Sequence, residues 1–86
     1  QMISTHPALS GPTHVLFQLD GDHVQVLDHG GDIDPGMIRA IAKIIETELR
    51  FSEDGARRYT VSAGCLCDVT ILPLLRNAGL CLAVVT

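Results

Sequence analysis

The sequence has few aromatic residues, and none of them is tryptophan. Phe and Tyr together make up 3% of the 86 residues, and they stand at Phe17, Phe51 and Tyr59. Nucleobases are commonly bound by stacking on such rings, so a base-binding platform is not expected. The hydrophobic core must come from Leu, Ile, Val and Ala, which dominate the 47% of hydrophobic residues.

Basic residues are also scarce and scattered. Six Lys and Arg residues stand against ten Asp and Glu residues, which gives a net charge of −4 and an isoelectric point near 5.3. Only Arg57 and Arg58 form a pair of neighbours in a strand-like segment. Nucleic acids and anionic membranes are bound by clusters of positive charge, so the sequence predicts neither as a partner.

Long apolar runs are missing as well. No run approaches the ~18 residues of a membrane span, and no basic segment precedes an apolar stretch as in a secretory signal. The cysteines are few and odd in number, and the first two are too close along a strand to bridge each other: Cys65, Cys67 and Cys81. Reduced thiols are typical of the cytoplasm, which is the predicted location, without membrane insertion.

The length and composition allow one folded domain. A chain of 86 residues holds one hydrophobic core, and 47% hydrophobic against 19% charged residues is too apolar for a disordered protein. Residues 1–12 contain prolines and a glycine without hydrophobic periodicity, and we interpret them as a leader arm. Residues 13–86 form the predicted domain.

The first part of this domain has the pattern of a β-hairpin. From Thr13, apolar side chains at Val15, Phe17 and Leu19 alternate with their neighbours, as in a strand with one buried face. An Asp-Gly turn follows at Asp20, which is a strong hairpin signal because glycine accepts a positive φ. A second strand is therefore expected over residues 23–28.

A helix is predicted to follow the hairpin. Asp34 is a good N-cap and Pro35 a good first helical residue, because proline gives up an amide that has no partner there. The helix is expected to run to about Phe51, with apolar side chains at spacings of three and four: Ile38, Ile41, Ile45 and Leu49, widened by Met37, Ala42 and Ile44.

Three more strands complete the predicted domain. Residues 57–63 and 65–75 have strand character and meet at Gly64, where a bulge or tight turn is expected. Residues 80–85 are almost continuously apolar, which is typical of a central strand covered on both faces or of a strand that joins an interface. The fold class is therefore α+β: a five-stranded antiparallel sheet with one long amphipathic helix, in the order β-β-α-β-β-β.

This arrangement resembles the roadblock family, whose relatives include longin and profilin-like folds. Over residues 13–86, the resemblance is carried by a hairpin with an acidic-Gly turn, a long helix and an apolar closing strand: Leu19-Asp20-Gly21, Met37-Ile38-Arg39-Ala40-Ile41-Ala42 and Gly79-Leu80-Cys81-Leu82-Ala83-Val84-Val85. It implies a non-catalytic homodimer or heterodimer in which long helices lie side by side and third strands pair across a twofold axis. Such dimers are platforms for small GTPases, motor subunits or signalling scaffolds.

The resemblance predicts an interface made by the helix and the third strand. Its expected residues are Ile38, Ile41, Ile45, Arg57, Arg58, Tyr59 and Val61. The arginines either keep an exposed edge strand from aggregating or pair with Glu46 or Glu48 of a partner's helix. One helix also cannot cover both faces of a sheet, so the second face is expected to need a partner, a ligand or polar side chains. Its apolar residues indicate that it is not fully polar and that something covers it: Leu16, Leu66, Leu72, Leu74 and Leu82.

Two groups of side chains raise the alternative of a metal site. The first third of the chain is rich in ligand-type residues: His14, Asp20, Asp22, His23, Asp28, His29, Asp32 and Asp34. Their spacing does not match a calcium loop, and turns and caps account for most of the aspartates. The thiols of Cys65, Cys67 and Cys81 are the other group, a soft-metal or redox site or simply small hydrophobic side chains.

Catalytic motifs are not recognisable. No G-x-S-x-G string is present, and the glycine pair Gly30-Gly31 lacks the spacing of a phosphate-binding loop. We therefore predict no enzyme activity, no catalytic residues and no cofactor. A small-ligand sensor with a pocket between helix and sheet is a further alternative, although ring side chains for a ligand cage are few.

Overall fold

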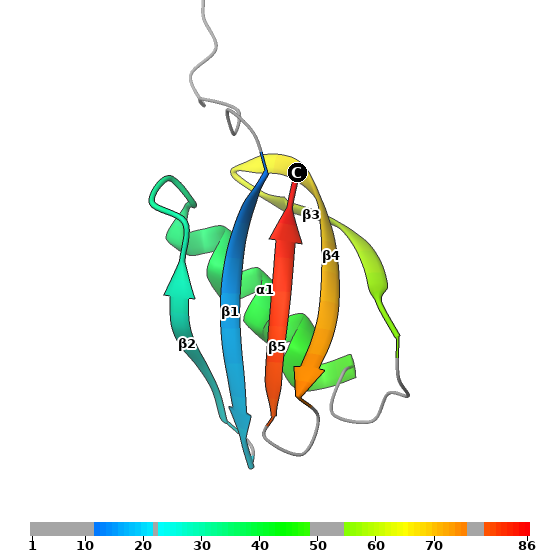
Figure 1. The fold of residues 1–86 in the computed structure, drawn as a ribbon. Helices are drawn as coiled ribbons and strands as arrows, with labels where there is room; N and C mark the ends of the chain where they lie inside the picture. Colours follow the sequence, from blue (N-terminus) through cyan, green and yellow to red (C-terminus); the bar gives the residue numbers. More distant parts are fainter. Residues whose placement is uncertain (1–11, 22, 49–54, 76–78) are drawn as a thin grey trace, which may run out of the picture.

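The computed structural model describes residues 12–21, 23–48, 55–75 and 79–86, so the expected leader arm falls almost entirely outside the described residues. The elements are β1 (Thr13–Asp20), β2 (His23–His29), α1 (Pro35–Glu48), β3 (Arg57–Ala63), β4 (Cys65–Leu75) and β5 (Leu80–Val85), as Figure 1 shows. The predicted α+β class, with a five-stranded antiparallel sheet and one helix, is confirmed for these residues.

The strands lie in the order β2-β1-β5-β4-β3. Neighbours along the chain form hairpins, and the two halves of the sheet are joined by β1 and β5, which align Leu16 with Leu82. β5 is therefore the middle strand, as its continuous apolar run predicts. β2 and β3 are the two edges, and each is paired on one side only among the described strands.

Two glycines make the turns between the later strands. Gly64 separates β3 from β4 with a φ of 86°, in the left-handed region that favours glycine. Gly79 precedes β5 with a φ of 72°, and a Cβ there would lie 2.5 Å from the carbonyl oxygen of Leu19. That close approach allows the Leu19 amide to donate to the Gly79 carbonyl at 2.8 Å, which ties β1 to the start of β5.

The start of α1 follows the predicted capping pattern. The side chain of Asp34 accepts from the Gly36 amide at 3.2 Å, and its backbone carbonyl accepts from Met37 and Ile38. These contacts satisfy amides that have no partner within the helix. The described helix ends at Glu48, and the predicted extension to Phe51 lies outside the described residues.

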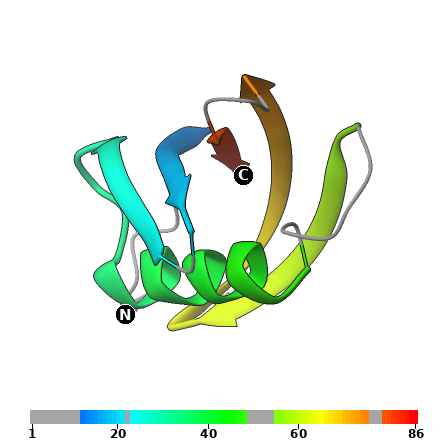
Figure 2. The same cartoon turned by 90° about the horizontal axis from the view of Figure 1, so that it is seen from below.

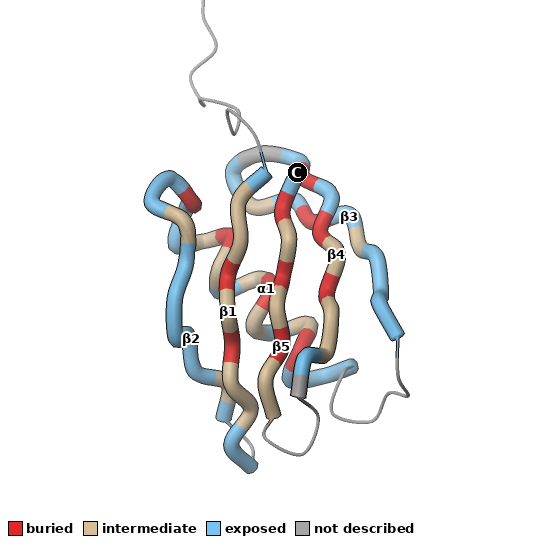
Figure 3. Tube along the Cα trace, viewed as in Figure 1, coloured by how far each residue is buried: buried red, intermediate tan, exposed pale blue. Residues whose placement is uncertain are grey.

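The core lies between α1 and one face of the sheet, which curves around the helix (Figure 2). Met37, Ile41 and Ile45 of α1 are buried there, against alternate residues of four strands: Val15, Phe17, Val61, Cys67, Val69, Ile71, Cys81, Ala83 and Val85. Figure 3 shows the alternation along β1, β5 and β4. No polar side chain of the described residues is buried.

The other side of the sheet, here called the outer face, is not covered by α1 (Figure 2). It carries the residues between the buried positions, because successive side chains of a strand point to opposite sides. Leu16, Leu72 and Leu82 lie there and are partly exposed, while Leu66 and Leu74 are 72% and 50% exposed. The second face is thus not fully polar, as the sequence predicts.

Candidate functional site

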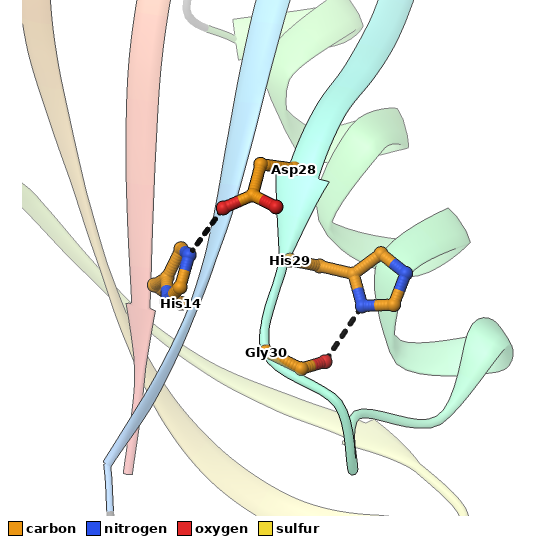
Figure 4. A network of polar contacts seen from close by, with 4 residues as sticks. All are labelled: His14, Asp28, His29 and Gly30. Atoms are coloured by element: carbon orange, nitrogen blue, oxygen red, sulfur yellow. Dashed lines mark hydrogen bonds and ion pairs between the residues drawn. The ribbon is translucent and has the colours of Figure 1, made fainter.

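The ligand-type side chains of the first third do not converge. Among the described residues, no group of three or more His, Cys, Asp or Glu side chains is placed to hold a metal ion. Asp22 lies outside the described residues. His14 and Asp28 do form a pair, with their Nε2 and Oδ2 atoms 3.0 Å apart (Figure 4).

This pair joins β1 and β2 on the outer face. Both side chains are exposed, by 45% and 68%, so the pair is a surface contact rather than a buried site. The hydrogen bond to His14 holds the pKa of Asp28 below its usual value of 3.8. His29 instead donates from Nδ1 to the Gly30 carbonyl at 2.6 Å and points away from the pair (Figure 4).

The register of β4 and β5 contradicts the predicted meeting of the three cysteines. Cys81 is aligned with Pro73, which is six residues along β4 from Cys67 and eight from Cys65. At ~3.3 Å per residue, the nearer separation is about 20 Å. The strands β4 and β5 are neighbours as expected, but they run antiparallel, so the start of β5, which holds Cys81, lies beside the end of β4. The side chain of Cys65 itself lies outside the described part of the chain.

Cys67 and Cys81 are instead part of the core. Each is 6% exposed and packs on the side of the sheet that α1 covers. Burial also raises the pKa of the Cys81 thiol above its ordinary value, which disfavours the reactive thiolate. These two cysteines therefore act as small hydrophobic residues, which was the simpler of the two interpretations.

The structure divides the predicted interface residues into two groups. Ile41 and Ile45 are 0% exposed and Val61 is 6% exposed, because the protein's own sheet and helix enclose them. Ile38 is partly buried and packs against the same core. The apolar stripe of α1 is thus occupied within one copy and offers little surface to a second one.

Arg57, Arg58 and Tyr59 of β3 form the second group, and they keep accessible surface. Arg57 and Arg58 are exposed on this edge strand. Tyr59 is partly buried, and its hydroxyl donates to Glu48 Oε1 at 3.2 Å. Glu48 therefore holds β3 against α1 within one copy, where the sequence left it as a candidate for pairing with a partner's arginine.

Sequence reasoning missed the exposed edge of β2. Val26 and Leu27 are 39% and 46% exposed there, next to a register shift between Leu16 and Phe17 of β1. The hairpin itself was predictable, but nothing local says that β1 rather than β2 joins β5. Edge position is a property of the strand order, which depends on contacts between distant parts of the chain.

Within the part of the chain that the structure describes, no helix has the length and apolar composition needed to cross a membrane. A scan against protein-family models, a search of curated proteins and a search of solved structures each gave no match.

Proposed function

We propose that this chain is a non-catalytic protein-interaction module that forms a homodimer through the edge strand β3 and acts as a scaffold or regulator. The observation that supports this most directly is that β3 is an accessible edge held in place by α1. An edge strand presents unpaired backbone donors and acceptors to another strand. The proposed partners, a small GTPase or a motor subunit, come from the roadblock resemblance.

The sequence of β3 is compatible with symmetric antiparallel pairing. Its seven residues run from Arg57 to Ala63, so the register that pairs the whole strand places Thr60 on the twofold axis. Arg58 then lies opposite the partner's Ser62, and the arginines of the two copies stay apart. Like charges directly opposite each other destabilise a strand pair, and this register avoids them.

The first prediction tests this pairing at Ser62, which is exposed on β3. Ser62→Arg places a cation opposite the partner's Arg58 twice in the dimer, and Ser62→Asp places an anion there. At roughly 0.2–1 kcal/mol per cross-strand pair, we expect Ser62→Arg to raise the dimer Kd about fivefold and Ser62→Asp to lower it by a similar factor. Sedimentation velocity over a concentration series measures both.

The opposite signs of the two variants separate pairing from damage to the fold, since misfolding weakens the dimer in both. Equal effects of Ser62→Arg and Ser62→Asp contradict the proposed register. A wild-type protein that stays monomeric at tens of micromolar contradicts the dimer itself. Far-UV circular dichroism of each variant provides the control that the sheet is intact.

A further inference from the structure

We infer that the outer face is a second contact between copies of this chain, in which two outer faces pack against each other about a twofold axis parallel to β5. This surface is distinct from the β3 edge, and the inference does not rest on the proposed function. It follows from the apolar rows of the face and from the placement of charge on its two flanks.

The centre of the outer face is a row of three leucines. Leu82 of β5 is aligned with Leu16 of β1 on one side and with Leu72 of β4 on the other. All three are partly exposed, and none belongs to the core or packs against it. Val84 continues the patch along β5 in the next row. These four side chains form a contiguous apolar surface that α1 does not cover, and such surfaces are used for protein contacts.

A twofold axis along β5 matches this row to itself. Because β5 is the middle strand, the rotation lays β1 of one copy over β4 of the other. Leu82 then meets the partner's Leu82, and Leu16 meets the partner's Leu72. Because the axis is parallel to the strands, the row of one copy lies at the same height along the strands as the row of the other copy. Each leucine of the row therefore meets a leucine of the partner.

The charges on the β2 and β3 sides of the sheet favour a twofold axis along β5 over a twofold axis across the strands. Asp28 lies on the β2 side, level with Leu16, and Arg58 lies on the β3 side, level with Thr70, which is in the row of Val84. The axis along β5 places each Asp28 on the same flank as the partner's Arg58. An axis across the strands places like charges together, which is disfavoured.

The curvature of the sheet sets the size of the contact. The sheet bends toward α1 (Figure 2), so two outer faces touch first along their central strands β1, β5 and β4. Packed sheets lie ~10 Å apart with strand directions within ~30° of each other. The flanking strands β2 and β3 lie farther from the partner than the central strands do.

The test uses a background in which the β3 edge cannot pair. Thr60→Lys places the cations of the two copies together on the β3 twofold axis. In this background we expect a dimer that persists, and we expect Leu82→Lys to weaken it at least tenfold because two ammonium groups are forced together at the centre of the outer face. Sedimentation equilibrium over micromolar to millimolar concentrations measures the Kd.

Leu66→Lys is the matched control. Leu66 is also on β4 and the outer face and is 72% exposed, but it is aligned only with Ser62 of β3 and lies beyond the end of β5. We expect its Kd to stay within twofold of the background. A monomeric background, or an equal effect of Leu82→Lys and Leu66→Lys, overturns the inference.

The outer-face contact and the β3 edge contact can be tested separately. In a Leu82→Lys variant with a natural β3, loss of dimer on adding Ser62→Arg reports on the edge contact alone. Far-UV circular dichroism and a urea midpoint within ~0.3 M of the parent show that Leu82→Lys leaves the fold intact. A folded Leu82→Lys variant that still dimerises in the edge-blocked background also overturns the inference.

Discussion

His14 and Asp28 face each other across β1 and β2, and their contact controls the protonation of the carboxyl group. The hydrogen bond from His14 is the main cause that lowers the pKa of Asp28 below 3.8. We therefore predict that His14→Ala raises this pKa toward 3.8. Carboxyl-carbon chemical shifts followed by NMR from pH 2 to 6 measure the change directly.

The lowered pKa of Asp28 also sets the direction in which stability changes with pH. A carboxyl group with a lowered folded-state pKa stabilises the protein above its unfolded pKa, and this stabilisation is lost as the pH falls through the folded pKa. The advantage of the wild type over His14→Ala is therefore present at pH 6 and is lost as the pH falls through the folded-state pKa of Asp28, which lies below 3.8. His29→Ala is the control, because the charge of His29 is the weakest of the causes acting on Asp28. A larger pKa change in His29→Ala contradicts the assignment.

At the scale of elements, the helix and strands were predictable because local rules define them. Asp34 and Pro35 mark the helix start, alternation marks β1, and glycines mark the turns. The strand order was not predictable, because β1 and β5 align Leu16 with Leu82, 66 residues apart in the sequence. The separation of Cys67 from Cys81, in contrast, was predictable. The short gap between the predicted strands 65–75 and 80–85 favours a hairpin, which places Cys81 beside the end of β4 and away from Cys67.

The apolar stripe of α1 was predictable, but the surface that it packs against was not. A row of apolar residues at helical spacing has the same appearance whether it meets the chain's own sheet or a partner. The structure assigns Ile41 and Ile45 to the core, so Ile38 alone keeps part of its surface accessible in the helical part of the predicted interface. The strand part, including Arg58, remains a prediction.

The packing of α1 leads to a prediction at this scale. Ile41 is 0% exposed and lies at the middle of the buried stripe, so Ile41→Ala leaves a cavity between helix and sheet. We expect the free energy of unfolding to fall by roughly 2–5 kcal/mol, measured by urea denaturation followed by circular dichroism. Lys43→Ala, at an exposed position of the same helix, is expected to change it by less than about 0.5 kcal/mol. Equal losses contradict the packing of α1.

At the scale of the whole molecule, one core connects the two ends of the sheet. Cys67 lies near the start of β4, at one end of the sheet, and Cys81 lies near the start of β5, at the other end. Both are buried in the same cluster beneath α1. A domain of this size commonly unfolds in one cooperative step. The two thiols are then exposed by the same event, although they are far apart.

This shared core predicts how the thiols react. In a Cys65→Ser variant, we expect Cys67 and Cys81 to be alkylated at the same slow rate in native buffer, since each is 6% exposed, with both rates rising together in urea. Burial also raises the pKa of Cys81, which keeps its thiolate fraction low while the fold is closed. Mass spectrometry of peptides from timed iodoacetamide reactions separates the two sites. If Cys81 alone is modified faster, the end of the sheet next to Gly79 opens independently. If Cys67 alone is modified faster, the end next to Gly64 opens independently. Either outcome contradicts a single cooperative core.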